Sequence, residues 1–354
     1  MKNEIEELLN ITIEEKASDL HLSVGLPPIL RVAGELVPLV KKPPVSVQLV
    51  EEVVLTFLGE EQRSRLRQDK EIDFSYHLEQ QGVRFRGNIF YTMGNLSVAL
   101  RFIPEKILTI EELNLPPVLH QFARASQGFV IIAGPSGHGK STTLASLVDE
   151  INHTRADHII TIEDPIEYVF RDDKSVIDQR EVTKDTKSFA SALRATFRQD
   201  PNVIMVGEMR DSETIGTALT AAETGHLVFA TLHTNSAGQT IHRIVDSFPA
   251  EQQSQVRAQL SGSLLGVVSQ RLLPRIQGGL IPVCEVLMAN TAVANLVREN
   301  KVHELPLVIE TSAEEGMISL NRALASLVKV REITLDSALQ YSLNPAELRT
   351  LVRR

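Results

Sequence analysis

The sequence has almost no cysteine and no long apolar run. Cys284 is its single cysteine among 354 residues, which excludes an internal disulfide and a zinc module with four cysteine ligands. This fits a reducing compartment, and we expect the Cys284 thiol to be buried as an apolar group. No stretch approaches the ~18 consecutive apolar residues of a membrane-spanning helix, and the acidic, amphipathic start is unlike a secretory signal. We therefore expect a cytoplasmic protein without direct membrane insertion.

Positive charge is also scarce. Lysine and arginine number 36 against 45 aspartates and glutamates, which gives a formal net charge of −9. No global basic field is available to bind a phosphate backbone, so we expect no nucleic-acid partner. The chain also lacks internal repeats and low-complexity tracts. Its length and its hydrophobic fraction of 43% favour two globular domains with real cores.

The first 104 residues mix helical and strand-like patterns. Apolar spacing predicts a first helix that ends near residue 16 and further helix over residues 47–66. Alternation with period two predicts strands at residues 17–22, 29–39 with a glycine turn, 72–76, 83–91 and 96–103. We interpret residues 1–104 as a small α+β domain, and residues 105–117, which contain two prolines, as a linker.

Strand-like and helical stretches alternate beyond residue 118. Apolar runs at residues 129–133, 159–162, 203–206 and 227–231 are separated by intervals long enough for crossover helices. One more apolar run, residues 280–288, precedes a helical C-terminal region. This alternation predicts an α/β fold with a doubly wound, mostly parallel sheet in residues 118–354.

The strongest signal is a glycine-rich segment between the run at 129–133 and a helical stretch. Strand, glycine loop and helix stand in the order that a phosphate-binding loop needs. Its backbone N–H groups and the helix N-terminus can surround phosphate oxygens, while Lys140 reaches the terminal phosphates and Ser141 ligates Mg²⁺. We expect the side chain of His138 to point away from phosphate. The predicted nucleotide-binding residues are Gly134, Pro135, Ser136, Gly137, His138, Gly139, Lys140, Ser141 and Thr142.

Hydrolysis of a γ-phosphate also needs acidic groups at the ends of neighbouring strands. The run at residues 203–206 ends at Gly207 and Glu208, which is the layout of a Walker B segment. We expect Glu208 to order the Mg²⁺ shell, partly through water. A surface carboxylate at a strand end is the alternative.

A second acidic cluster follows the run at residues 159–162. Glu163, Asp164 and Glu167 flank Pro165. Carboxylates beside a phosphate are costly unless a metal or arginine compensates, so a role in activating water is reasonable. Glu167 is the first candidate for the general base and Glu163 is the second. A solvated acidic loop remains the alternative.

Two histidines bracket the strand expected at residues 227–231. Because His226 and His233 stand at its two ends, they cannot contact the same atom, and a shared metal is not expected. Either histidine could sense the γ-phosphate by hydrogen bonding, although isolated histidines are more often structural.

Three arginines alternate with apolar residues in the N-terminal strands. Arg84, Arg86 and Arg101 should share a face along each strand. Such a face is commonly just solvated. As functional groups they would reach the phosphate loop of a neighbouring subunit as arginine fingers, which predicts a ring.

Four segments in this order resemble the secretion ATPase superfamily, and most closely the PilT-type ATPases of type IV pilus retraction, or twitching motility. They are residues 134–141, 161–167, 200–211 and 221–234. Residues 17–22 and 85–88 are similar to the N-terminal domain of that family. Related assembly and secretion ATPases are longer and usually carry a four-cysteine zinc element, so the single cysteine favours the retraction branch.

The resemblance implies a PAS-like N-terminal domain and a RecA-like ATPase domain that uses ATP and Mg²⁺. It implies a homohexamer at the pilus base, on the cytoplasmic face of the inner membrane, with an inner-membrane platform protein as partner. It gives Glu167 the role of catalytic base and Glu208 that of Walker B acid. His226, His233 and the three arginines would act at the nucleotide.

The chain departs from the family pattern at two positions. His138 replaces a small residue of the phosphate loop, where the backbone and not the side chain faces phosphate. Ala294 replaces the first arginine of the segment at residues 292–299 that is associated with retraction. The alternatives in function are a secretion or DNA-uptake ATPase of the same superfamily, a nucleic-acid motor, and a regulatory nucleotide-binding subunit.

Overall fold

The computed structural model describes residues 2–32, 34–78, 83–103 and 106–353. Contacts between Cα atoms divide the chain into two units, Met1–Lys106 with Pro165–Val169, and Ile107–Asp164 with Phe170–Arg354. Each unit has its own sheet and its own core. The predicted domain boundary at residues 104 and 105 lies outside the described residues.

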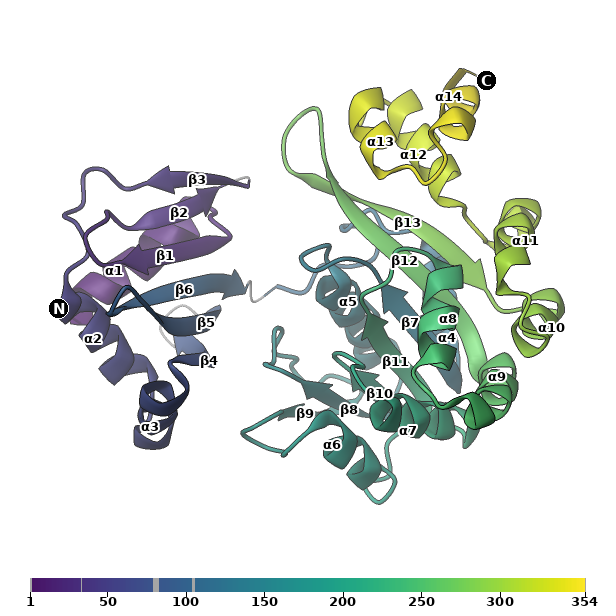
Figure 1. The fold of residues 1–354 in the computed structure, drawn as a ribbon, viewed down its shortest axis with the longest axis horizontal. Helices are drawn as coiled ribbons and strands as arrows, with labels where there is room; N and C mark the ends of the chain where they lie inside the picture. Colours follow the sequence, from purple (N-terminus) through teal and green to yellow (C-terminus); the bar gives the residue numbers. More distant parts are fainter. Residues whose placement is uncertain (1, 33, 79–82, 104–105, 354) are drawn as a thin grey trace. The chain divides into compact units, whose positions relative to one another are not determined.

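The N-terminal unit is an antiparallel sheet packed on helices (Figure 1). The strand order is β3-β2-β1-β6-β5-β4. Apolar residues alternate with polar ones along β5, so the period of two that is visible in the sequence is also the register of the sheet. The predicted α+β character is confirmed. The elements are α1 (Lys2–Glu14), β1 (Asp19–Ser23), β2 (Ile29–Val32), β3 (Glu35–Pro38), α2 (Val47–Phe57), α3 (Glu60–Asp69), β4 (Glu71–Leu78), β5 (Val83–Thr92) and β6 (Asn95–Ile103).

The helical stretch predicted at residues 47–66 is interrupted. Leu58 ends α2 and Gly59 precedes α3, and both have extended backbone conformations. Two consecutive extended residues break the ladder of helical hydrogen bonds, so the chain turns between α2 and α3.

The C-terminal unit is an α/β sheet with the strand order β13-β12-β7-β11-β10-β8-β9. Neighbouring strands are parallel except β12 and β13. The predicted mostly parallel sheet is confirmed. The elements are η1 (Pro117–Leu119), α4 (His120–Arg124), β7 (Gly128–Ala133), α5 (Lys140–Thr154), β8 (His158–Glu163), β9 (Val176–Glu181), α6 (Phe189–Thr196), β10 (Val203–Val206), α7 (Ser212–Glu223), β11 (Leu227–Leu232), α8 (Ala237–Asp246), α9 (Ala250–Ser263), β12 (Leu264–Pro274), β13 (Leu280–Met288), α10 (Thr291–Arg298), η2 (Val302–Glu304), α11 (Leu305–Thr311), η3 (Ala313–Glu315), α12 (Leu320–Lys329), α13 (Leu335–Tyr341) and α14 (Pro345–Arg353).

Two strands of this sheet were not predicted. β9 lies at the sheet edge and is mostly polar, so it lacks an apolar signal. β12 follows α9 without an intervening turn and therefore lacks a boundary signal.

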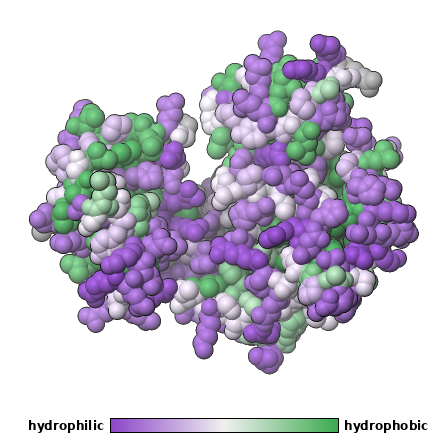
Figure 2. Space-filling view, viewed as in Figure 1, coloured by the Kyte–Doolittle hydropathy of each residue, from purple (hydrophilic) through white to green (hydrophobic). Residues whose placement is uncertain are grey.

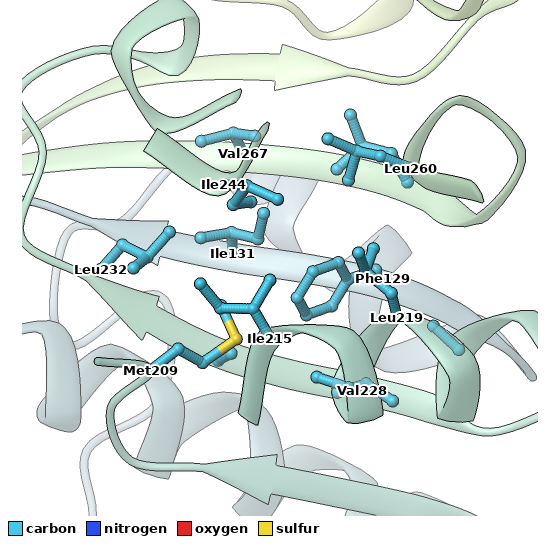
Figure 3. Packing of buried hydrophobic residues seen from close by; sticks show 14 of the residues in the cluster. Phe129, Ile131, Met209, Ile215, Leu219, Val228, Leu232, Ile244, Leu260 and Val267 are labelled. Atoms are coloured by element: carbon cyan, nitrogen blue, oxygen red, sulfur yellow. The ribbon is translucent and has the colours of Figure 1, made fainter. Parts of the chain in front are cut away.

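The core of the C-terminal unit lies between the sheet and helices α7 to α9. Phe129 and Ile131 of β7 pack beside Ile215 and Leu219 of α7 and Leu260 of α9 (Figure 3). All five are buried, and each such side chain contributes about 1.5–3 kcal/mol when fully buried. The packing therefore holds β7, whose last residue, Ala133, directly precedes the phosphate loop. Cys284 is buried as predicted, and burial raises the pKa of its thiol to about 12.

Exposed apolar side chains occur in both units, and one group of them lies in the N-terminal unit. Figure 2 shows them over the part that holds β1 to β3, and the edge strand β3 includes the exposed Leu36 and Val37. Among the described residues, no helix combines the length and the apolar character that crossing a membrane requires.

Candidate functional site

Strands β7, β8, β10 and β11 are parallel and end at the same edge of the sheet, here named the carboxyl edge. The register pairs Ala133 of β7 with Leu232 of β11, and Val206 of β10 with Ile162 of β8. The segments that follow these strands therefore meet at one place. Ligands of parallel α/β sheets bind at this edge.

The phosphate loop connects β7 to α5 at the carboxyl edge. Gly134 and Gly139 have φ of +148° and +79°, a region that L residues rarely adopt. A Cβ atom on Gly134 would also lie 2.3 Å from the carbonyl oxygen of Gln270 on β12. Glycine is thus required both by the backbone angles and by the close approach of β12.

All nine predicted nucleotide-binding residues lie in this loop and in the first turn of α5. Nζ of Lys140 donates to the carbonyl oxygens of Gly134 and Pro135, each at 2.9 Å. Ser141 and Thr142 are in the first turn of α5, whose N–H groups and dipole favour an anion. The ring of His138 is turned toward β12, where Nδ1 accepts a hydrogen bond from the backbone N–H of Leu272 at 2.9 Å.

Glu208 lies just beyond the end of β10 among positive groups. Its Oε2 is 2.8 Å from Nη2 of Arg210, and its Oε1 is 3.3 Å from Nε2 of His233. Burial pushes the pKa of Glu208 upward, but Arg210, His233 and Lys140 outweigh it, so the net pKa is below its usual value. Glu208 is therefore an ionised carboxylate at neutral pH.

His233 follows β11 and contacts Glu208. Burial lowers its pKa, and the charges of Lys140 and Arg210 lower it further, against the opposing effect of Glu208. A lowered pKa leaves the ring neutral at pH 7, so it can both donate and accept a hydrogen bond. The structure thus brings together Lys140, Glu208 and His233, three of the predicted catalytic residues.

The two candidate bases occupy different surroundings. Glu163 ends β8 and is buried, and its Oε1 accepts hydrogen bonds from Oγ1 of Thr161 at 2.7 Å and Nε2 of Gln179 at 3.2 Å. Glu167 belongs to the segment Pro165–Val169, which groups with the N-terminal unit, and its Oε1 is 3.3 Å from Nη1 of Arg86. Glu163 is therefore in the unit that holds the phosphate loop. Glu167 and its partner Arg86 both group with the N-terminal unit.

The three predicted arginines share one face of the N-terminal sheet. Arg84 and Arg86 alternate along β5, and Arg86 pairs directly with Arg101 of β6. Arg84 donates to Oγ of Ser75 at 2.9 Å, and Arg101 donates to Oδ1 of Asp19 at 3.0 Å. The face therefore groups three arginines in the N-terminal unit, and carboxylates pair with two of them, Glu167 with Arg86 and Asp19 with Arg101.

His226 lies at the opposite edge of the sheet from the phosphate loop. It precedes β11, roughly 20 Å from His233 at 3.3 Å per residue. Its Nδ1 donates to the carbonyl oxygen of Ala221 at 2.9 Å, at the C-terminal end of α7. Within one chain, the structure does not bring His226 to the other candidate residues.

One residue that touches the phosphate loop was missed by sequence reasoning. Gln270 of β12 donates from Nε2 to the carbonyl oxygen of His138 at 2.9 Å and accepts at Oε1 from Oγ1 of Thr143 at 2.7 Å. Its only signal in the sequence is a polar amide side chain within the largely apolar stretch that forms β12. That signal points to the phosphate loop only when β12 is known to pair with β7.

The residues fit a magnesium ion bound mostly by phosphate and water. Mg²⁺ in nucleotide sites takes one or two protein ligands together with phosphate oxygens. Ser141 offers a hydroxyl and Glu208 an ionised carboxylate. Over the described ranges, no group of three or more His, Cys, Asp or Glu side chains forms a metal-binding cluster. The arrangement can bind a nucleoside triphosphate and polarise its terminal phosphate.

The sequence and fold match known proteins over nearly their whole length. The family model for type II/IV secretion system proteins matches residues 1–335. The type IV pilus retraction ATPase PilT of Pseudomonas aeruginosa is 45% identical over 336 residues, which cover 95% of this chain and 97% of that protein. The type IV pilus ATPase PilU of the same organism is 41% identical over 351 residues, which cover 99% and 91%. A crystal structure of the pilus retraction motor PilT with bound ADP matches with a TM-score of 0.89 and 47% identity, covering 97% of this chain and 98% of that one.

Proposed function

Because the chain belongs to the type II/IV secretion system protein family, we propose that it is a homohexameric, Mg²⁺-dependent ATPase motor for type IV pilus retraction. The observation that carries this proposal is 45% identity to a retraction ATPase over 97% of its length. ATP hydrolysis itself follows from the family and from the match to an ADP-bound ATPase. We propose that it acts at the pilus base, on the cytoplasmic face of the inner membrane, where it would bind an inner-membrane platform protein.

The proposed roles at the carboxyl edge follow from the charges there. Lys140 and the first turn of α5 bind the phosphates. Ser141 and Glu208 would hold Mg²⁺, which supplies positive charge at the phosphate oxygens. His233 contacts Glu208 and senses whether the terminal phosphate is present.

Glu167 is the proposed general base, with Glu163 as the second candidate. For Glu167→Gln we expect ATP to bind while turnover falls by about 10²–10⁴-fold, the usual contribution of a general base. Single-turnover hydrolysis and ATP binding would be measured for this variant and for Glu163→Gln. Normal turnover in Glu167→Gln together with a large loss in Glu163→Gln would move the role to Glu163.

The arginine face of the N-terminal unit is proposed to act on the nucleotide of a neighbouring subunit. Arginine fingers supplied in this way stabilise the charge of phosphoryl transfer. Closure of one unit over its neighbour would then convert nucleotide state into a mechanical stroke. Any catalytic role of His226 would likewise need a neighbouring subunit.

A concentration series tests the ring. Steady-state hydrolysis would be measured against protein concentration, alongside mass by light scattering. We expect specific activity to rise as a hexamer-sized species forms. A fully active monomer would contradict the proposal that subunits share the active site, but not the proposed nucleotide site.

Mixing two inactive variants tests the shared site directly. Lys140→Ala lacks the phosphate ligand, and Arg101→Ala lacks one arginine of the face. If arginines act between subunits, mixed assemblies contain complete sites and recover activity. No recovery in mixed hexamers would place all catalytic groups of one site in one chain.

Residue 294 bears on coupling to the pilus. The retraction-associated segment forms α10, where Val293 and Val297 are buried and Ala294 is half-buried. This helix contains none of the candidate catalytic or nucleotide-binding residues. We propose that Ala294→Arg changes twitching motility in cells while leaving hydrolysis by the purified protein unchanged.

A further inference from the structure

Gln270 lies behind the phosphate loop and is 2% exposed. It follows Ser269, the last residue of β12 that pairs with β7, so it stands level with the start of the loop. Its side chain joins two parts of the nucleotide site, because it bonds to His138 in the loop and to Thr143 in α5.

The orientation of the Gln270 amide is fixed by its partners. The carbonyl oxygen of His138 can only accept a hydrogen bond, so the NH₂ group of Gln270 must face it. The hydroxyl of Thr143 donates to the remaining oxygen of the amide. Residue 138 is also held through its ring by the backbone N–H of Leu272, so β12 fixes both its main chain and its side chain.

The bond to the His138 carbonyl acts on the peptide group that links His138 to Gly139. That group is planar, so holding its oxygen also sets the direction of the Gly139 N–H on its other side. A hydrogen bond to the oxygen polarises the peptide and strengthens its N–H as a donor. In a phosphate loop, such N–H groups are the phosphate ligands.

We propose that Gln270 is a positioning residue of the nucleotide site, which orients the His138–Gly139 peptide for phosphate binding without contacting the nucleotide itself. This inference rests on the proposed nucleotide site. It adds a residue that affects nucleotide affinity and that lies on β12, outside the sequence motifs of the site. Gln270 bonds to His138 and Thr143 and not to the nucleotide. We therefore expect it to affect the binding of ATP and ADP equally.

Gln270→Met tests the donor, because methionine has a similar length and cannot donate. We expect the Kd for ADP and the KM for ATP each to rise about tenfold, as for the loss of one well-placed hydrogen bond, with kcat within about twofold. Gln255→Met on α9 is the matched control, since Gln255 is exposed, and both constants should stay at wild-type values.

Gln270→Glu gives a readout that loss of packing cannot imitate. An ionised glutamate faces the His138 carbonyl with an acceptor, whereas a protonated one regains a donor. Because burial raises the pKa of a carboxyl group, the KM of this variant should fall toward the wild-type value between pH 8 and pH 6. Neither the wild type nor Gln270→Met should show that recovery.

The outcomes separate this inference from the nucleotide site on which it rests. Wild-type ADP affinity in Gln270→Met, or a lowered kcat with unchanged KM, would overturn the positioning role. Lys140→Ala is measured in parallel, and wild-type ADP affinity there would instead remove the nucleotide site. If Gln270→Glu does not fold, Thr143→Val serves in its place, because the amide oxygen of Gln270 then loses its donor and the side chain is held by His138 alone. We then expect a rise in the Kd for ADP of about threefold, and an unchanged Kd would contradict the proposal.

Discussion

His226 and His233 stand at the two ends of β11 in the mostly parallel sheet, His233 at the carboxyl edge and His226 at the opposite ends of the strands, here named the amino edge. His233 contacts the carboxylate of Glu208, in a group of charged side chains that includes Lys140. His226 donates to a main-chain carbonyl at the end of α7. The same residue type on the same strand therefore has a charged partner at one edge and a structural partner at the other.

Other polar side chains at the amino edge also bond to main-chain groups, as His226 does. The side chain of Asn202 accepts from the backbone N–H of His158 at 2.8 Å, and Nδ1 of His158 donates to the carbonyl oxygen of Asp200 at 3.1 Å. These groups tie loops to strand ends. The comparison teaches that the edge of the sheet, more than the residue type, decides whether a polar side chain faces chemistry or supports the fold.

The sharpest test of the comparison removes a lysine from each edge. Lys140→Ala should lower hydrolysis at least about a thousandfold, because the loop loses its one positive phosphate ligand. Lys174→Ala, an exposed lysine beside the start of β9, should leave hydrolysis unchanged. Steady-state ATPase assays and thermal melts would be run on both, and we expect both to keep the fold. Substantial turnover in Lys140→Ala would break the assignment of the carboxyl edge.

An acid exchanged at each edge should give the next largest effect. Glu208→Gln keeps the shape of the side chain and removes the charge that Arg210 and His233 surround, so we expect about a hundredfold loss of kcat. Asp178→Asn, whose exposed side chain bonds to His158 at the amino edge, should change kcat by less than about twofold. The Mg²⁺ dependence of the rate would be measured for both. An unchanged Mg²⁺ requirement in Glu208→Gln would remove its metal role.

The two histidines give a matched pair on one strand. His233→Ala should lower kcat about tenfold through lost contact with Glu208. His226→Ala should keep turnover and lose about 0.5–1 kcal/mol of unfolding free energy, because the carbonyl of Ala221 at the end of α7 loses the ring of His226 as one of its hydrogen-bond donors. Turnover at 25 °C and the Tm would be compared. A loss of turnover in His226→Ala equal to that in His233→Ala would show that a neighbouring subunit brings His226 to an active site.

The sequence predicted those parts of the site that depend on residues close together in the chain. The phosphate loop needs glycines, a lysine and a following helix in consecutive positions, so its residues could be identified from the motif. Glu208 and His233 were candidates because each follows an apolar run, and the ends of parallel strands meet at one edge. The alternation of Arg84 and Arg86 likewise gave their common face.

Other features depend on pairing between distant segments. Gln270 bonds to a residue 132 positions earlier, and only the insertion of β12 beside β7 places it there. The sequence also could not show that the segment around Glu167 groups with the N-terminal unit, since this depends on tertiary contacts such as Arg86 to Glu167. Motif spacing carries no information about such contacts.

The smallest expected effect concerns stability at the amino edge. There α5 returns from the phosphate loop, and His120 lies between Glu150 and Glu111, with Nδ1 2.8 Å from Oε2 of Glu150 and Nε2 2.6 Å from Oε1 of Glu111. Glu150 chiefly raises the pKa of His120, burial opposes it, and Glu111 adds to the rise. A raised folded pKa means that this contribution is complete below about pH 6.5, the unfolded value, and is lost as pH rises through the folded pKa.

We therefore expect the Tm difference between the wild type and His120→Gln to be larger at pH 6 than at pH 8. The change should be about 1–2 °C, as for an exposed ion pair in a domain of this size. Burial lowers the pKa of His138 and His233, which makes stability rise with pH, so only the difference between wild type and variant isolates His120. ATPase activity should be equal in both proteins at each pH, because His120 is remote from the carboxyl edge. A Tm difference that grows toward pH 8 would contradict the sign, and a loss of hydrolysis would contradict the separation of the two edges.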